Sequence, residues 1–199
     1  MEMKLSFLSA RVLSLAVVFL VGQVCFGKGV VDLDKSPGEV QFKAVGKPSF
    51  LKINGKEGKA KGQITIDGKS IEGKVSVEID DMKTGLSLRD DHKKKKYLET
   101  KKFPKATLKI TELTLEKPII GKSAKMSELP FEGTFTLHGE SKKVKGKVDI
   151  KSKGDSVEAE ARFDIKITDY NIDLPSYKGI TVADKVEVIV NIEGPIEKQ

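Results

Sequence analysis

The chain has 199 residues, of which 38% are hydrophobic and 33% charged, and its formal net charge is +7. This composition is typical of a soluble protein with one buried core, and it excludes a disordered chain and a membrane protein with several spans. After residue 27 the only arginines are Arg89 and Arg162, and the many lysines alternate with other residues instead of gathering beside aromatic side chains. We therefore expect no nucleic-acid partner, whereas peripheral contact with anionic lipid head groups at a membrane is left open.

Residues 1–27 have the layout of a secretory signal peptide. Basic residues flank an apolar run at residues 12–21, which is shorter than the roughly 20 residues that a membrane-spanning helix needs. Cys25 and Gly27 supply the small side chains that a signal peptidase pocket requires. The sequence therefore predicts cleavage after Gly27 and a periplasmic or secreted protein.

Cys25 is the only cysteine, so the mature chain is expected to hold neither a disulfide nor a thiol nucleophile. Attachment of a lipid anchor to Cys25 is the alternative to simple cleavage. It is disfavoured because Val24 is a poor fit for the small residue expected before a lipoprotein cysteine. The remaining residues, 28–199, have the size of one domain.

A period-two alternation of apolar and polar residues recurs in runs between residues 40 and 192, which is typical of β-strands with one buried face. Four turn signals of the hairpin type separate these runs: Asn54-Gly55, Asp67-Gly68, His138-Gly139 and Lys153-Gly154-Asp155. No long helical pattern lies between the runs, so consecutive strands are expected to pair antiparallel. The sequence predicts an all-β fold of about eight to ten strands that hide their apolar faces in a closed barrel or a sandwich.

Residues 81–105 break the alternation and carry the densest charge of the chain. Leu88, Tyr97 and Leu98 are expected to pack inward from a short helix over one end of the fold. Pro104 then restarts extended structure, because the residue before a proline avoids the helical conformation. We expect this segment to form a short helical lid.

Two stretches carry a resemblance to a known family. Residues 84–92 read Thr-Gly-Leu-Ser-Leu-Arg-Asp-Asp-His, followed by Tyr-Leu-Glu at 97–99 and Lys-Phe-Pro at 102–104. Residues 131–144 contain a strand, a His-Gly turn and a Lys-x-Val strand. In these motifs, together with the leader and the alternating strands, the chain resembles the YceI-like family of bacterial secreted proteins over residues 28–195.

The resemblance implies an extended antiparallel lipocalin-like β-barrel of about eight strands. It also implies that the apolar channel of the barrel holds a long amphiphilic lipid, a polyisoprenoid or similar molecule, in the periplasm. The expected function is non-catalytic binding, storage or transport of this lipid. The alternative is a filled barrel that acts as a structural or adhesive protein of the cell envelope.

Arg89, Asp90 and His92 form the sharpest polar cluster among the matching motifs. One interpretation places them at the mouth of the barrel, where Arg89 and His92 face a polar or phosphorylated head group while the tail of the lipid lies inside. The other interpretation, which is slightly favoured, pairs Arg89 with Asp90 or Asp91 as an anchor of the lid. A half-buried Arg needs a carboxylate whatever the ligand is.

The ligand-contacting interior of the barrel is expected to include four apolar residues, namely Phe42, Phe135, Leu137 and Phe163. The alternative is that these side chains fill the core, as they do in small eight-stranded barrels. The sequence alone does not decide between a hollow and a filled barrel.

The sequence offers little for catalysis or metal binding. The only histidines are His92 and His138, and no Gly-x-Ser-x-Gly elbow is present. No acidic loop follows calcium-binding spacing, so no metal is expected, and His138 is expected to be a hydrogen-bonded turn residue. We expect a protein that is not an enzyme and has no cofactor apart from a bound isoprenoid-type lipid; a homodimer is left open.

Overall fold

The computed structural model describes residues 27–47, 52–84, 97–177 and 180–199. Within these ranges the chain is built from strands, with two short 3-10 helices after β4 and β8. The elements are β1 (Lys28–Asp32), β2 (Gly38–Lys47), β3 (Lys52–Asp67), β4 (Ser70–Glu78), η1 (Ile79–Asp81), β5 (Lys105–Leu113), β6 (Ala124–Leu137), β7 (Glu140–Lys153), β8 (Ser156–Lys166), η3 (Ile167–Tyr170), β9 (Ser176–Tyr177), β10 (Ile180–Pro195) and β11 (Glu197–Lys198).

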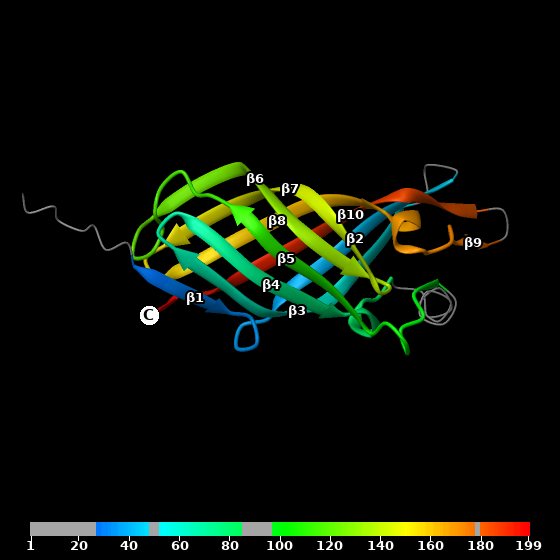
Figure 1. The fold of residues 1–199 in the computed structure, drawn as a ribbon, viewed down its shortest axis with the longest axis horizontal. Helices are drawn as coiled ribbons and strands as arrows, with labels where there is room; N and C mark the ends of the chain where they lie inside the picture. Colours follow the sequence, from blue (N-terminus) through cyan, green and yellow to red (C-terminus); the bar gives the residue numbers. More distant parts are fainter. Residues whose placement is uncertain (1–26, 48–51, 85–96, 178–179) are drawn as a thin grey trace, which may run out of the picture.

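Strands β2 to β8 and β10 close into an eight-stranded antiparallel barrel (Figure 1). The long strand β3 completes the ring, because its first part pairs with β2 and its second part pairs with β4. Strand β1 continues the edge of β2 by pairing with the last residues of β3, and β11 adds to β1. The predicted all-β antiparallel barrel is confirmed.

The predicted signal peptide ends at Gly27, and residues 1–26 lie outside the described part of the chain. Cleavage and lipidation at Cys25 therefore stay predictions. The first strand, β1, begins at Lys28. Over the described ranges, no helix combines the length and the hydropathy that crossing a membrane requires.

Three of the predicted turns join consecutive strands. Gly68 lies between β3 and β4, Gly154 lies between β7 and β8, and His138 and Gly139 lie between β6 and β7. His138 and Gly139 have φ angles of 51° and 80°, as the two central residues of a type I′ hairpin turn require. Turn chemistry in the sequence thus located three of the hairpins correctly.

The turn predicted at Asn54-Gly55 is wrong. Both residues lie inside β3, where Gly55 is directly opposite Phe42 of β2. A β-carbon on Gly55 would lie 1.9 Å from Cε1 of Phe42, so the ring occupies the space that any other side chain would need. Glycine is required here for the close approach of a ring and not for a reversal of the chain.

The two ends of the barrel differ. At the end that holds β1 and residues 114–123, which we call the sealed end, Leu33, Leu115 and Ile119 are at most 1% exposed. The opposite end carries η3, β9 and residues 97–103, and we call residues 97–103 the strap (Figure 1). Buried side chains lie at the strap end as well, where Tyr170 is 1% exposed.

The predicted lid is described only in part. Residues 85–96, including Leu88, lie outside the described residues, so a helix there stays a prediction. Tyr97 and Leu98 are partly buried and pack against the core, as predicted. Strand β5 begins at Lys105, so Pro104 does restart extended structure.

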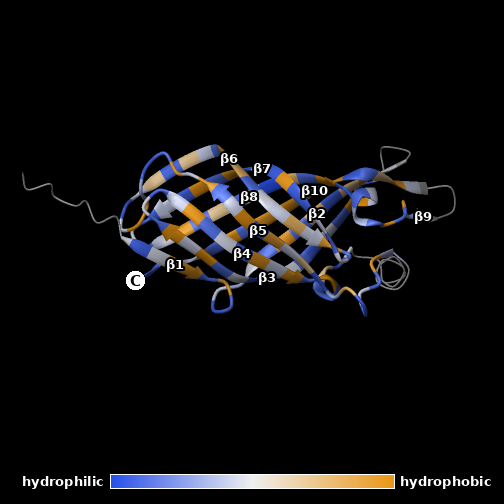
Figure 2. Ribbon diagram, viewed as in Figure 1, coloured by the Kyte–Doolittle hydropathy of each residue, from blue (hydrophilic) through white to orange (hydrophobic). Residues whose placement is uncertain are grey.

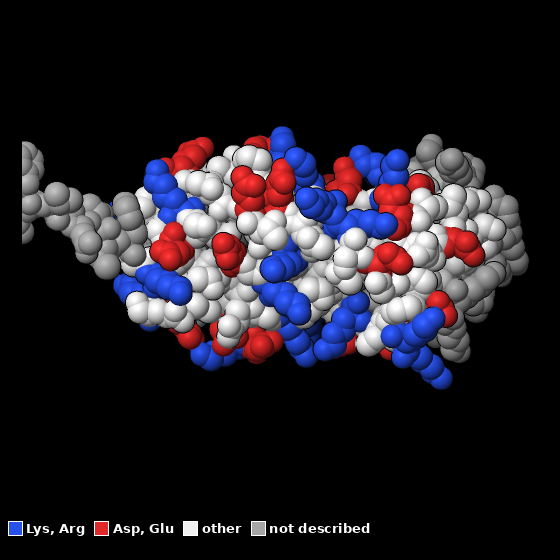
Figure 3. Space-filling view, viewed as in Figure 1, with Lys and Arg blue, Asp and Glu red and all other residues white. Residues whose placement is uncertain are grey.

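Charged side chains of both signs are interspersed over the outer face of the barrel (Figure 3). Many are paired across strands, as in Lys185–Asp164 at 2.9 Å and Lys105–Glu78 at 3.0 Å. Exposed pairs of this kind add little stability because water screens them. The lysines on the described strands thus belong largely to a solvated surface.

Candidate functional site

The interior of the barrel is apolar along its length. Figure 2 shows hydrophobic and hydrophilic residues alternating along the strands, so that each strand contributes its apolar positions to the inside. Among the described residues, the only buried polar ones are Thr100 and Ser152. The Ser152 hydroxyl donates to the carbonyl oxygen of Lys122 at 3.0 Å and is thereby satisfied. The described part of the wall therefore offers hydrocarbon contact and no buried charge.

The four side chains predicted to line the interior all lie on its apolar face. Phe135, Leu137 and Phe163 are 6%, 8% and 3% exposed, and Phe42 is only partly buried. The structure therefore brings the four residues to the inside of one barrel. Their contact with a ligand stays a prediction.

An aromatic cluster occupies the β6–β8 side of the interior. The ring of Phe163 lies edge-on to Phe131 and to Phe135, with centroids 6.1 and 5.2 Å apart. Tyr170 of η3 extends the cluster toward the strap end, with its ring centroid 5.8 Å from that of Phe135. Edge-to-face pairs of this kind stabilise beyond the area that they bury.

Sequence reasoning missed Tyr170 as an interior residue. It is 1% exposed, and burial together with the charge of Asp169 raises the pKa of its phenol to about 12. Because η3 is a 3-10 turn, the period-two pattern that marks the strands does not extend to it. Phe131 did belong to the alternating pattern, so its inward position follows from the sequence.

The strap is tied to the barrel at both of its ends. At one end, the Tyr97 hydroxyl accepts a hydrogen bond from the backbone N–H of Ser176 in β9 at 3.3 Å. At the other end, the ring of Phe103 packs edge-on against His138, with centroids 4.5 Å apart. Thr100, between the two, is 5% exposed. The strap therefore spans from β9 to the β6–β7 turn.

His138 uses both of its ring nitrogens and connects the strap to η3. Nδ1 lies 3.1 Å from the carbonyl oxygen of Tyr170, and Nε2 lies 2.9 Å from Oε2 of Glu99 in the strap. The side chain of His138 is 10% exposed, whereas that of Glu99 is 46% exposed. The expected hydrogen-bonded turn histidine is confirmed, and its partners connect three separate segments.

A family model described as the YceI-like domain matches residues 32–194. The chain belongs to the YceI-like family. The match covers every strand of the barrel and confirms the resemblance noted in the sequence. A comparison with curated protein sequences gave no match.

Two solved structures of similar proteins share the fold of this YceI-like chain. BcnA from Burkholderia cenocepacia is 19% identical with a TM-score of 0.62, and the alignment covers 82% of this chain and 99% of that one. A polyisoprenoid binding domain from Saccharophagus degradans, implicated in plant cell wall breakdown, is 13% identical with a TM-score of 0.61, covering 86% and 98%. At these identities the likeness shows the fold.

The predicted head-group cluster of this YceI-like chain, Arg89, Asp90 and His92, lies outside the described residues. Both interpretations of that cluster, as a head-group site and as an anchor of the lid, therefore stay open. Within the ranges that are described, no group of three or more His, Cys, Asp or Glu side chains is placed to hold a metal ion.

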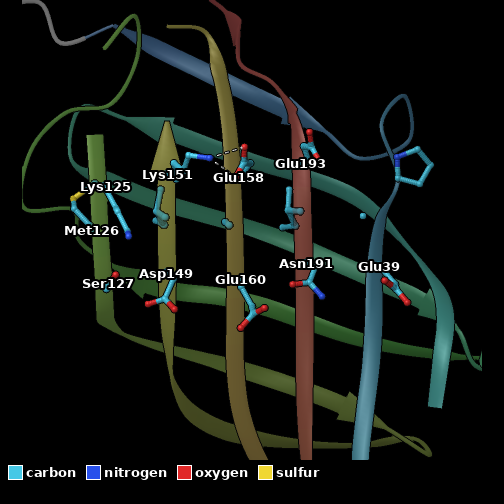
Figure 4. Close-up of a pocket in the computed structure, with 15 residues that line it drawn as sticks. Glu39, Lys125, Met126, Ser127, Asp149, Lys151, Glu158, Glu160, Asn191 and Glu193 are labelled. Carbon is cyan, nitrogen blue, oxygen red and sulfur yellow. Dashed lines mark hydrogen bonds and ion pairs between the residues drawn. The ribbon is translucent and has the colours of Figure 1, made fainter. Parts of the chain in front are cut away.

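A polar groove of about 510 Å³ crosses the outside of the barrel over β6, β7, β8, β10 and β2. Two rows of side chains border it: Lys125, Lys151, Glu158 and Glu193 in one, and Ser127, Asp149, Glu160, Asn191 and Glu39 in the other (Figure 4). Its floor is the backbone of positions whose side chains point inward, such as Ile150. Carboxylates dominate its borders, so this groove does not suit a hydrocarbon tail.

Asp149 in this groove supports an irregular point of the neighbouring strand. Its Oδ1 accepts the backbone N–H of Glu128 at 2.8 Å, where β6 bulges between Met126 and Leu129, and its Oδ2 lies 2.6 Å from Arg162. The Glu128 N–H and the nearby guanidinium hold the pKa of Asp149 below its usual value. Asp149 is thus used to hold the wall of the barrel together.

Proposed function

We propose that this YceI-like protein binds a long amphiphilic lipid, a polyisoprenoid or similar molecule, inside its barrel, and stores or transports it without chemical change. The observation that carries the proposal is the continuous apolar interior inside a closed wall, with buried polar residues limited to Thr100 and Ser152 in the described chain. Each buried methylene of a ligand contributes about 0.8 kcal/mol, so a long chain gains affinity along the whole channel. The neighbour from Saccharophagus degradans, named as a polyisoprenoid binding domain, supports this class of ligand.

The first test is to purify the protein from its own host and to identify what it carries by native mass spectrometry and lipid extraction. The expected result is a mass increment that matches one lipid with a long hydrocarbon chain. Protein that is recovered free of lipid, and that takes up none when it is offered isoprenoid alcohols, would overturn the proposal.

Two variants of neighbouring residues in β2 give the test a matched control. Phe42→Gln places an amide in the apolar interior and is expected to weaken lipid binding about tenfold, the effect of roughly 1.4 kcal/mol. Lys43→Gln introduces the same side chain on the outer face, where Lys43 is 53% exposed, and is expected to bind lipid like the wild type. Equal binding by both variants would place the ligand elsewhere.

The aromatic cluster favours a second candidate, a filled barrel that acts as a structural or adhesive envelope protein. Phe131, Phe135, Phe163 and Tyr170 contact one another through edge-on rings and leave no role for a ligand between them. The two functions differ in what co-purifies, because a filled barrel carries no lipid. The same mass measurement therefore separates them.

We also propose that the strap end contacts the membrane from which the lipid is taken. The large hydrophobic residues that stand out as exposed in the described chain are Val45 at 43% and Leu174 at 40%. Val45 and Leu174 lie near each other, because the residues that follow them, Gly46 and Pro175, both contact Val182. Val182 pairs with Gly46 and donates its N–H to the carbonyl oxygen of Pro175 at 2.8 Å. Flotation with anionic vesicles tests this contact: the double variant V45E/L174E is expected to lose binding, and unchanged flotation would contradict it.

The proposed location is the periplasm or the outside of the cell, following cleavage after Gly27. Support comes from the leader-like composition of residues 1–27. Cell fractionation followed by N-terminal sequencing tests it, with Lys28 as the expected first residue. A mature chain that begins at a lipid-modified Cys25 would instead establish an anchored protein.

A further inference from the structure

Phe42 lies flat against the wall of the barrel although its side chain points inward. It is directly opposite Gly55 of β3, and a β-carbon on Gly55 would lie 1.9, 2.4 and 2.5 Å from Cε1, Cδ1 and Cζ of the ring. The ring therefore covers the glycine instead of extending toward the axis of the barrel. Its inward neighbours on the same strand, Val40 and Ala44, are 6% and 4% exposed, whereas Phe42 keeps part of its surface accessible.

The flat position of this ring depends on the absence of a side chain at Gly55. On its other side, Phe42 is directly opposite Val188 of β10, a branched side chain that is 6% exposed and fills that part of the wall. A methyl group at position 55 would push the ring off β3. Because Val188 blocks the β10 side, the displaced ring of Phe42 could move only toward the axis of the barrel or toward the strap end.

The same arrangement recurs on the other side of the interior. Phe131 is directly opposite Gly146, where a β-carbon would lie 2.6 and 2.8 Å from Cε1 and Cζ of its ring. A β-carbon there would also lie 2.4 Å from the backbone oxygen of Arg162, which cannot move aside easily. Gly55 is the better position for an experiment, because its three nearest atoms all belong to the Phe42 ring.

An eight-stranded barrel is just wide enough to be filled by its own side chains or to hold one small ligand. A ring that lies flat against the wall narrows the interior only by the thickness of the ring. A ring that points to the axis narrows the interior by more. We infer that Gly55 sets the bore of the channel beside Phe42: it lets the ring lie flat, which leaves room for one flexible hydrocarbon chain and for no second chain. This inference rests on the proposed lipid-binding function.

The experiment compares binding of one-chain and two-chain probes by purified, delipidated protein. The one-chain probe is cis-parinaric acid, followed by its fluorescence, and the two-chain probe is dioleoyl phosphatidylcholine. The wild type is expected to bind the first and to reject the second. Gly55→Ala is expected to bind cis-parinaric acid about tenfold more weakly, because the displaced ring enters the channel.

A double variant makes the prediction specific. Gly55→Ala combined with Phe42→Ala removes the ring that would be displaced, so binding is expected to return to the wild-type level. Gly194→Ala is the matched control, because a β-carbon at position 194 meets its nearest atoms at 3.3 to 3.8 Å, and it is expected to bind like the wild type.

The outcomes separate this inference from the proposed function. If the wild type binds neither probe, the lipid-binding function itself fails. If the wild type binds cis-parinaric acid and Gly55→Ala binds it equally well, or the double variant does not recover, the role of Gly55 is overturned. If Gly55→Ala does not fold, Phe42→Ala alone is the test. Removing the ring widens the channel, so this variant is expected to bind dioleoyl phosphatidylcholine. A Phe42→Ala protein that still rejects this two-chain lipid would refute the inference.

Discussion

Glu99 and His138 are 39 residues apart in the chain, yet Oε2 of Glu99 lies 2.9 Å from Nε2 of His138. On the other side of the ring, Nδ1 faces the carbonyl oxygen of Tyr170 at 3.1 Å. One ring nitrogen of His138 thus contacts η3 and the other contacts the strap. The contact between Glu99 and His138 fixes the strap to the β6–β7 turn.

We predict that His138→Phe loosens the strap. The new ring still packs against Phe103, but it donates no hydrogen bond and leaves Glu99 without its partner. Losing a hydrogen bond to a charged group costs about 1.5–3 kcal/mol, so amide exchange in the strap is expected to rise about tenfold or more. Hydrogen–deuterium exchange with mass spectrometry measures this for the peptide 97–103.

Two further variants test the cause of that change. Glu99→Gln is expected to loosen the strap less than His138→Phe, because the amide donates to Nε2 of a neutral imidazole. Glu132→Gln removes a carboxylate that is paired with Lys145 on the outer face and is expected to leave strap exchange unchanged. Equal protection of the strap in all variants would show that the Glu99–His138 contact does not hold it.

Asp149 is predicted to make stability depend on pH. Its pKa is held below the usual value by the N–H of Glu128 and by Arg162, so the folded state favours the charged carboxylate. The contribution is therefore present above the ordinary pKa of an aspartate, about 3.9, and is lost as pH falls through the lower folded value. Asp149→Asn is expected to unfold more easily than the wild type at neutral pH, by about 1 kcal/mol because the site is partly exposed.

The difference between wild type and Asp149→Asn is expected to shrink when the pH falls below about 3.9. Urea unfolding at neutral and acid pH measures it. Asp155→Asn is the control, because Asp155 pairs with Lys198 on the surface and supports no bulge. A gap between wild type and Asp149→Asn that stays constant down to the lowest pH would rule out the linkage.

The strands and their inward faces could be predicted from the sequence because the period-two alternation recurs in most of the strands between Val40 and Ile192. The glycine at position 55 was misread, since the same residue type serves a tight turn and the close approach of a ring. Tyr170 was missed because a 3-10 turn carries no alternation. The pairing of Glu99 with His138 could not be foreseen, because it depends on how the strap crosses the end of the barrel.

Gly139 and Gly154 each lie in a two-residue hairpin turn, and comparing them separates backbone strain from packing. Their φ angles are 80° and 62°, so alanine is strained at both positions. A β-carbon on Gly139 would lie 2.7 Å from Cε1 of Phe103, whereas one on Gly154 meets nothing within 4 Å. We predict that Gly154→Ala lowers the free energy of unfolding by about 1 kcal/mol, and Gly139→Ala by clearly more.

Urea unfolding of the two variants measures this difference, and exchange in the strap shows its location. Only Gly139→Ala is expected to loosen the strap, because the displaced Phe103 belongs to it. Equal destabilisation by both variants, with no effect on the strap, would mean that the contact between Phe103 and the turn is not needed.

Tyr170 is predicted to weaken the fold at high pH. Its pKa is raised to about 12 by burial and by Asp169, whereas a tyrosine in the unfolded chain ionises near 10. The folded state therefore keeps its proton between these values while the unfolded state loses it, and stability is lost as pH rises through this window. A difference of two pKa units corresponds to about 2–3 kcal/mol of stability, which is fully lost only above the folded pKa.

Tyr170→Phe keeps the ring against Phe135 and removes the ionising group, so the stability of this variant is expected to fall less than that of the wild type between pH of about 10 and 12. Urea unfolding at several pH values compares the two proteins under the same lysine titration, and parallel losses of stability would show that the phenol of Tyr170 is not the group responsible.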